Sequence, residues 1–502
     1  MLKQLVGRFD NYMQVHPKLK WVLLAIAIKL IYFVWFTYAV HQVWPSNKIV
    51  KGVFVKSWEY GDYLNPIENL IDKGTYYSLD YEFNTKLYTH RMPGFLPAYA
   101  LQYWLFGRDF AYMSLVVLHY LLDGIAVYLL SMCALMLFNR RAAFYLTFLV
   151  YGLSPFVTVY NNHGFSEPLC TFAIVATLYF FLKGLLEKKK KFYFISGFFF
   201  CWAVFLRPSV GMLGVLFPIA LLFYDGFKIS RIKYYLESGI LFSLTLVVCL
   251  SAWTYRNYKI TGKPILLADT YDVYLTKQAA ALWGIVITWG GDIQPWNPNS
   301  EARWFKPKTD WRFDQRLSNG NPFKSFIFTK DYGIADLRIM RSYYWLSIDS
   351  NESASSRNTY ADSTVNMIKR FEQSFKTEKP FYYYCVTKLI LLRDFILIRQ
   401  TYALPFDKFT LYQKMVRAMV LLFYYFVIIG ATIGLFMAWI KSDFLIRWVS
   451  LLPLLYIATH VKLGFIENRY LAEVYPVIIL FLTFSLTKVW AFYQQKIQSD
   501  KQ

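Results

Sequence analysis

The sequence lacks the short motifs that mark nucleotide-using and zinc-binding proteins. Neither a G-x-G-x-x-G fingerprint nor a P-loop occurs, so a nucleotide sugar is not the expected substrate. Four of the five cysteines lie inside apolar stretches and only Cys385 lies in a polar region, which predicts neither a disulfide framework nor a zinc site. Acids are few and scattered, with 32 Asp and Glu against 54 Lys and Arg. We therefore expect no metal site and no cofactor. Use of a divalent cation is the alternative.

The chain also lacks the polar surface of a soluble protein. Of its 502 residues, 56% are hydrophobic and 20% aromatic, and the mean hydropathy is +0.31, whereas soluble domains are roughly 45–50% apolar. We therefore expect a polytopic membrane protein. The net charge of +22 does not indicate nucleic acid, because Lys and Arg lie mainly between apolar blocks and in one long loop, as expected for topology signals and lipid-headgroup contacts.

Apolar blocks long enough to cross a hydrocarbon core of about 30 Å predict an all-α protein. The first, Trp21 to Val40, has no small-residue cleavage site after it, so we expect a retained anchor. Block 192–224 has basic runs at both ends, which predicts two short crossings joined by a turn at Arg207-Pro208. Together with 21–40, the blocks expected to cross once are 110–137, 142–160, 166–186, 236–255, 414–440, 444–461 and 470–493.

About ten crossings result, and they place both termini and the basic runs in the cytosol. The first loop, 41–109, then lies on the external face, within an N-terminal transmembrane module of residues 1–255. Residues 256–413, between crossings seven and eight, are too long and too aromatic for a linker, so we expect a folded external domain there. Residues 414–502 form the C-terminal transmembrane module. Within the loop, Tyr382 to Gln400 reads as an amphipathic helix on the membrane surface.

The most informative stretch runs from Ser57 to Gly107. Asp62 follows Gly61, a short helix is expected from Asn65-Pro66, and the sequence R-x-P-G-F-x-P follows His90. Residues 93–107 are apolar enough to lie in the membrane interface. The stretch therefore reads as a reaction site beside a membrane.

This pattern resembles the first external loop of the GT-C glycosyltransferases, which include protein O-mannosyltransferases and aminoarabinose transferases and use polyprenyl-phosphate sugars. Four shorter segments extend the resemblance to most of the chain except residues 258–413. They are S-E-P at Glu167, F-L-R-P-S at Arg207, W-x-x-R-N at Arg256, and E-x-R-Y from Glu467 to Tyr470. Only one acid leads the first loop, where protein O-mannosyltransferases have an Asp-Glu pair, and this disfavours protein mannosylation specifically.

The resemblance implies that Asp62 is the catalytic carboxylate, which takes the acceptor proton. Taken without the resemblance, Asp62 is better explained as a solvated loop acid that caps the helix beginning near Asn65. The resemblance implies that Glu167 orients the acceptor or shares the role of base. Its alternative is an acid at a helix start, stabilised by roughly 0.3–1 kcal/mol.

Arginines at outer helix ends could bind the donor phosphate, since convergent guanidinium groups suit phosphate oxygens. For any one of them the alternative is a side chain that snorkels to the membrane surface. The predicted substrate-binding residues are His90, Arg91, Arg207, Arg256, Glu467, Arg469 and Tyr470.

The expected function is therefore an inverting sugar transfer from a polyprenyl-phosphate donor to a lipid, glycan or protein acceptor. We expect a multi-pass protein of a bacterial cytoplasmic membrane, with the site on the periplasmic face. A transporter or flippase of lipid-linked glycans is the alternative, because Lys29, His119 and Asp123 lie within predicted helices. A non-catalytic membrane scaffold is the third hypothesis.

Overall fold

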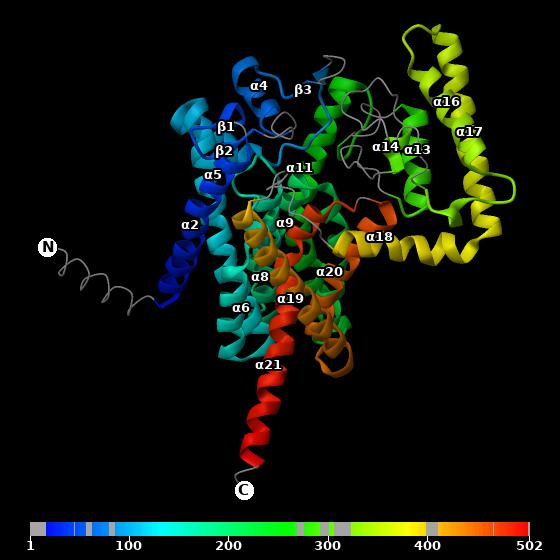
Figure 1. Ribbon diagram of the computed structural model, residues 1–502. Helices are drawn as coiled ribbons and strands as arrows, with labels where there is room; N and C mark the ends of the chain where they lie inside the picture. Colours follow the sequence, from blue (N-terminus) through cyan, green and yellow to red (C-terminus); the bar gives the residue numbers. More distant parts are fainter. Residues whose placement is uncertain are drawn as a thin grey trace. The chain divides into compact units, whose positions relative to one another are not determined.

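The computed structural model describes residues 17–44, 46–56, 63–79, 86–268, 276–291, 301–305, 323–397, 410–464 and 466–499. These residues are almost entirely helical (Figure 1). In them the only sheets are two antiparallel pairs, β1 (Ile49–Val50) with β2 (Phe54–Val55), and β3 (Ser78–Leu79) with β4 (Lys86–Leu87). The predicted all-α class is confirmed.

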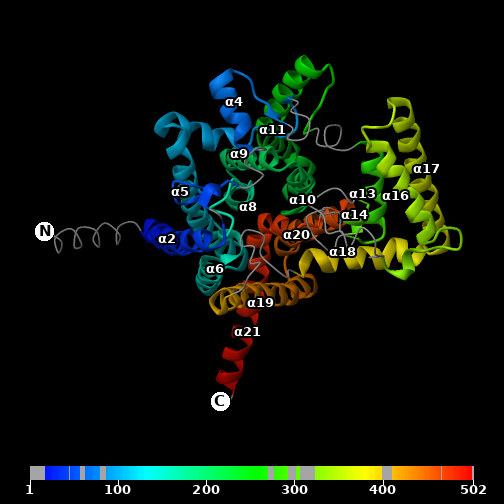
Figure 2. The same ribbon diagram turned by 45° about the horizontal axis from the view of Figure 1, so that its top comes forward.

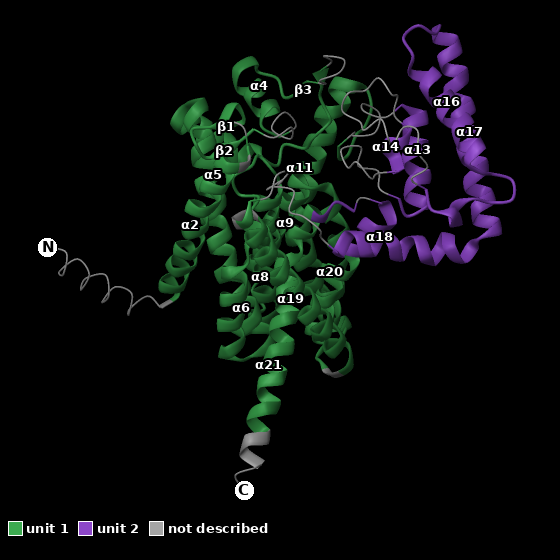
Figure 3. Ribbon diagram, viewed as in Figure 1, with its two compact units in different colours: residues 1–268, 398–456, 469–502 green, residues 269–397, 457–468 purple. Residues whose placement is uncertain are grey.

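The chain divides into two compact units (Figure 3). The first comprises residues 1–268, 398–456 and 469–502, and the second comprises 269–397 and 457–468. The division into 1–255, 256–413 and 414–502 stays a prediction.

The first unit is a bundle of long apolar helices. Within the described ranges, seven helices are long and apolar enough to cross a membrane, and the chain is an integral multi-pass membrane protein. The helices of this bundle are α2 (Pro17–Val43), α5 (Leu96–Phe138), α6 (Arg141–Leu153), α7 (Pro155–Thr158), α8 (Glu167–Glu187), α9 (Lys190–Leu206), α10 (Leu216–Phe223), α11 (Ile232–Thr261), α19 (Leu411–Lys441), α21 (Tyr475–Ser499) and α20 (Phe444–Leu463), of which the part up to Tyr456 belongs to this unit.

Helix α8 lies at the centre of this bundle (Figure 2). It packs on α5, α9 and α21, and it is the most buried of the seven candidate spans. Its first residue, Glu167, therefore begins a helix that is packed against three other helices.

Two predicted crossings differ from single straight helices. Within 142–160, α6 ends at Leu153 and α7 begins at Pro155, because Pro155 has no N–H to continue the helical ladder. Within 192–224, α9 ends before Arg207, and the 3-10 helix η2 (Pro208–Val215) leads into α10. The chain turns back here, since Phe217 contacts Phe200 with ring centroids 5.3 Å apart. The predicted break at Arg207-Pro208 is thus present, and the count of ten crossings stays a prediction.

The first loop carries the predicted short helix α4 (Asn65–Lys73), which ends at Gly74 in the left-handed region (φ 71°). Its buried Glu68 accepts hydrogen bonds from Tyr99 (2.8 Å) and Tyr112, and it pairs with Arg108. All three partners belong to α5, so Glu68 anchors α4 on that helix.

The first turns of α5 are bent away from the rest at Gly107, whose φ of 71° and ψ of 168° are not helical. Trp104 is 80% exposed, and Leu101, Leu105 and Phe106 are also exposed. An exposed apolar half-helix is what the predicted interfacial position requires.

The second unit is a smaller helical domain with its own core. Trp289, Trp304, Phe323 and Phe371 pack at its centre. The predicted helix at 382–400 is present from Tyr382 to Ile396, as the π-helix η5 (Tyr382–Val386) and α18 (Thr387–Ile396), and residues 398–400 lie outside the described residues. Its place on a membrane surface stays a prediction. The other helices are α13 (Lys277–Thr288), α14 (Glu301–Trp304), η4 (Ser325–Ile327), α16 (Ile334–Ile348) and α17 (Ala354–Glu378).

Candidate functional site

Four charged side chains from three segments that are far apart in the sequence meet inside the first unit. Glu167 begins α8, Arg207 follows α9, and Arg469 and Glu473 belong to the 3-10 helix η6 (Asn468–Glu473). The two glutamates are 0% exposed, and the arginines are 8% and 3% exposed. Two cations and two anions balance formally, as a buried site requires. We call these four residues the buried charge cluster.

Arg207 is the centre of the buried charge cluster. Its Nη2 donates to Glu167, its Nε lies 2.7 Å from Oε1 of Glu473, and Nε also donates to Ser166 Oγ at 2.8 Å. Arg469 Nε lies 3.6 Å from Oε1 of Glu167. Neither arginine reaches an exposed position, as snorkelling would require.

Local sequence explains this geometry. Pro208 disfavours helical backbone at the residue before it, and Arg207 is accordingly extended (φ −146°, ψ 105°), which ends α9. Glu167 is the first residue of α8, where the positive end of the helix dipole favours an anion. The predicted helix-start position of Glu167 is confirmed, and its partner there is Arg207.

Aromatic side chains surround the buried charge cluster. Tyr456 donates its hydroxyl hydrogen to Glu473. The Tyr470 ring centroid lies 4.4 Å from the guanidinium carbon of Arg207 and 5.3 Å from that of Arg469. The sequence analysis missed Glu473 and Tyr456. An acid inside an apolar block, as in L-A-E-V-Y, is the signal that could have found Glu473.

Glu473 predicts a pH dependence of stability. Burial raises its pKa to about 7, although Arg207 opposes the shift. Between pH 4.5, the ordinary value, and about 7, the folded state therefore binds more protons than the unfolded state, and stability falls as pH rises through this window. We expect a lower Tm in detergent at about pH 8 than at about pH 5. Glu473→Gln should flatten this slope, and an equal slope in both proteins would contradict the assignment.

Asp62 lies outside the described residues, and the first described residue after it is Tyr63. The Tyr63 hydroxyl accepts a hydrogen bond from Ser166 Oγ at 3.4 Å. Its ring centroid lies 4.9 Å from the guanidinium carbon of Arg91. The N-cap position of α4 is held by Leu64. The first loop thus reaches the buried charge cluster through Tyr63 and brings Arg91 with it.

The turn of the R-x-P-G-F motif docks on the end of α9. Trp202 Nε1 donates to Gly94 O at 2.9 Å. A Cβ at Gly94 would lie 2.4 Å from Leu206 N and from the carbonyl of Phe205. Backbone meets backbone here, one residue before Arg207, so only glycine fits.

We expect Gly94→Ala to lower stability and to disturb the position of Arg207. Overpacking costs about 1–3 kcal/mol, and the clash is with backbone that cannot rotate away. Thermal unfolding in detergent measures the loss. Gly284→Ala in α13 is the control, because a Cβ there meets nothing within 4 Å. Equal Tm values for the two variants would show that the loop yields without cost.

The remaining predicted residues lie elsewhere. Arg256 donates to the backbone carbonyls of Tyr76 (2.7 Å) and Tyr88 (2.5 Å), and so ties the first loop to α11 rather than joining the buried charge cluster. His90 is buried in that loop, and Glu467 is a buried residue of the second unit.

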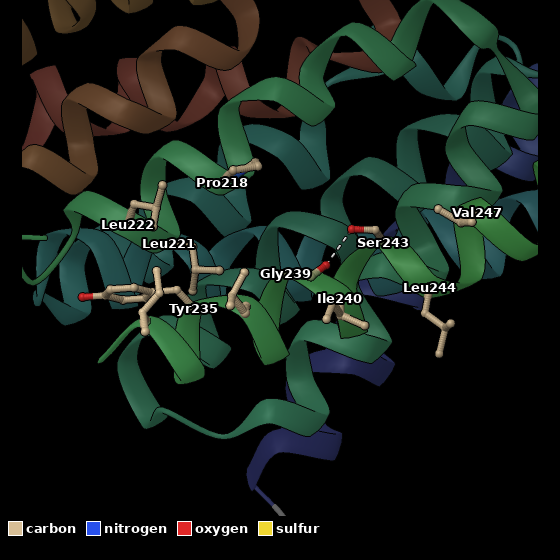
Figure 4. A pocket seen from close by; sticks show the side chains of 11 residues that line it. Pro218, Leu221, Leu222, Tyr235, Gly239, Ile240, Ser243, Leu244 and Val247 are labelled. Atoms are coloured by element: carbon tan, nitrogen blue, oxygen red, sulfur yellow. Dashed lines mark hydrogen bonds between the residues drawn. The ribbon is translucent and has the colours of Figure 1, made fainter. Parts of the chain in front are cut away.

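An apolar cavity of about 480 Å³ lies between α10 and α11 (Figure 4). Pro218, Leu221, Ile240 and Leu244 are among its lining residues. Ser243 points its hydroxyl to Gly239 O at 2.6 Å, so this polar group is satisfied. None of the residues of the buried charge cluster lines the cavity. Its surface suits hydrocarbon and not a sugar or phosphate.

In the part of the chain that the structure describes, no group of three His, Cys, Asp or Glu side chains could hold a metal ion. Asp62 and Glu59 lie outside that part.

No protein-family model and no curated protein matches the chain. Among solved structures, it is similar to an Archaeoglobus fulgidus oligosaccharyltransferase tethered with an acceptor peptide, at 14% identity and a TM-score of 0.48, over 96% of this chain and 50% of the other. It is also similar to the oligosaccharyltransferase AglB of that organism in complex with an inhibitory peptide and a dolichol-phosphate, at 12% identity and a TM-score of 0.47, over 98% and 52%. The chain thus spans about half the length of these two.

A third similar structure is ArnT from Cupriavidus metallidurans bound to undecaprenyl phosphate, at 12% identity and a TM-score of 0.36, over 93% of this chain and 78% of the other.

Proposed function

We propose that this membrane protein is a GT-C glycosyltransferase that moves a sugar, with inversion, from a polyprenyl-phosphate donor to a lipid, glycan or protein acceptor. One observation carries the proposal. The separate motifs that resemble this superfamily, at Arg91, Glu167, Arg207 and Arg469, converge around the buried charge cluster and Tyr63. Segments this far apart in sequence need not meet, so their convergence supports a common site.

The proposed reaction needs one base and no acid. The acceptor O–H or N–H gives its proton to Asp62, the acceptor atom bonds to the anomeric carbon, and the bond from that carbon to the phosphate oxygen breaks. The polyprenyl phosphate leaves as a weakly basic anion that cations stabilise. Glu167 is buried against Arg207, so we assign it to positioning and keep Asp62 as the base.

At least one of Arg207, Arg256 and Arg469 is proposed to contact the donor phosphate. Arg469 lies in the buried charge cluster within the E-x-R-Y motif, and Arg91 lies beside Tyr63 within the R-x-P-G-F motif. We assign the phosphate contact to these two arginines because both of their motifs meet near Ser166 and Glu167. The polyprenyl chain would lie in the apolar cavity, whose lining from Ile232 to Val247 follows α11 for about 22 Å.

Conservative substitution tests the phosphate contact. Arg grips phosphate oxygens in a bidentate manner and Lys does not. Losing one charge-assisted hydrogen bond, worth about 1.5–3 kcal/mol, should lower donor affinity or turnover about 10- to 150-fold in Arg469→Lys or Arg91→Lys. Turnover is measured with purified protein and a polyprenyl-phosphate sugar. Arg338→Lys, exposed on α16, is the control. Full activity in Arg→Lys variants at positions 91, 207, 256 and 469 would reject the phosphate contact.

A transporter of lipid-linked glycans is the second candidate, because Lys29 and Asp123 form an ion pair (3.3 Å) inside α2 and α5. Intramembrane ion pairs are typical of transporters. Proteoliposomes distinguish the two functions. Sugar transfer with no change in the sidedness of the lipid-linked glycan supports the enzyme, and movement across the bilayer without transfer supports the transporter.

A further inference from the structure

The break between α6 and α7 leaves Tyr151 O without its α-helical donor, and this carbonyl accepts instead from Ser154 N at 3.2 Å. Pro155 has no N–H, so it cannot donate to Tyr151 O as the next helical residue would. The side chain of Lys29 supplies donors here, because its Nζ donates to Tyr151 O (3.2 Å) and Ser154 O (3.4 Å). Lys29 is 0% exposed. It therefore acts as the cap of a helix that ends inside the bundle.

Asp123 holds the other side of the same segment. Thr158 accepts from Lys29 Nζ at 2.8 Å and donates to Asp123 Oδ2 at 2.8 Å, and Asn161 Nδ2 lies 3.4 Å from the same oxygen. Asp123 is 4% exposed and lies 3.3 Å from Lys29 Nζ. The ion pair therefore makes hydrogen bonds to the segment at both Ser154 and Thr158.

The segment then connects to the first loop. Asn162 accepts from Tyr120 (2.6 Å) and donates to Val53 O (2.9 Å), and Val55 N donates to Asn162 O (2.8 Å). A Cβ at Gly164 would lie 3.2 Å from Phe54 and 3.4 Å from Leu64. Leu64 belongs to the same short stretch as Asp62 and Tyr63.

The same segment ends at Ser166 and Glu167, the partners of Arg207. We propose that the Lys29–Asp123 ion pair is a positioning device, which sets the segment 154–166 and thereby places Glu167 relative to Tyr63 and Leu64. The expected effect on kcat rests on the proposed function, whereas the expected effect on the structure of segment 154–166 does not. Lys29 and Asp123 themselves touch no reacting atom.

A matched set of variants separates positioning from plain stability. A single change, Lys29→Met or Asp123→Leu, leaves a buried charge unpaired and should lower Tm strongly. The double variant removes both charges, and buried ion pairs replaced by apolar residues commonly keep their stability. It lacks the hydrogen bonds to Tyr151 O, Ser154 O, Thr158 and Asn161. The control is Lys183→Met, which removes a partly exposed pair with Glu187 (3.8 Å) near the other end of α8.

Two readouts on the purified full chain decide the matter. We expect the double variant to have a Tm near that of the parent, faster amide hydrogen exchange at 159–166, and a kcat at least about tenfold lower with KM for the donor within about twofold. Unchanged exchange and unchanged kcat in a stable double variant would overturn the proposal. If the parent transfers no sugar at all, the proposed function fails, and the exchange at 159–166 still decides whether the ion pair positions this segment.

Discussion

Replacing Arg207 by methionine is expected to destabilise the folded protein by about 3–5 kcal/mol. Arg207 is the cation shared by Glu167 and Glu473, both 0% exposed. Its removal leaves two buried carboxylates with Arg469 as the only other cation of the buried charge cluster. Tm and the denaturant midpoint in detergent measure the loss.

The defect of Arg207→Met should be smaller in acid. The pKa of Glu473 is already raised to about 7 by burial, and losing Arg207 removes an interaction that favours its charged form. Glu473 of the variant then keeps its proton to a higher pH than Glu473 of the parent, so the defect should be smaller below about pH 7 than above it. Arg256→Met is the control, since Arg256 donates to backbone carbonyls and has no carboxylate partner in the described chain. Equal losses in both variants, at acid and neutral pH, would contradict the central role of Arg207.

Asp62→Asn is expected to lower turnover by at least about 100-fold while folding and donor binding stay largely intact. The amide keeps the shape of the side chain but cannot accept the acceptor's proton. Turnover with a polyprenyl-phosphate sugar, donor affinity and Tm should be measured on the same preparation. A loss of kcat without a loss of Tm identifies chemistry rather than structure.

The control for Asp62→Asn is Asp72→Asn on α4. Asp72 accepts from Tyr103 at 2.9 Å on the exposed side of that helix, so its change should leave turnover unaffected. Near-normal turnover in purified Asp62→Asn protein would move the role of base to Glu167 or Glu59. Loss of stability with Arg207→Met and loss of chemistry with Asp62→Asn would together separate the scaffold of the site from its reactive group.

Much of the fold follows from local sequence. Apolar runs predict the long helices, because a membrane requires every backbone group to be paired within its own segment. Pro208 follows the end of α9 at the predicted turn, and Pro155 follows the end of α6 inside the predicted single crossing 142–160, since each lacks the N–H that continues a helix. Pro453, in contrast, lies inside α20. The start of α8 at Glu167 and the extent of α4 up to Gly74 are local features of the same kind. The sequence could therefore predict some of the helix ends, such as the break at Arg207-Pro208, and not others, such as the break at Pro155.

The partners of charged residues depend on packing instead. Arg207, Arg256 and Arg469 look alike in sequence as arginines at helix ends, yet two of them enter the buried charge cluster and Arg256 binds a loop backbone. Glu473 belongs to none of the motifs that resemble the glycosyltransferases. Its meeting with Arg207 requires η6 and the end of α9 to lie side by side, and that proximity is produced by the tertiary packing of helices distant in the chain. Sequence alone determined the long apolar helices and the break at Arg207-Pro208, and the tertiary structure decided which buried charges neutralise one another.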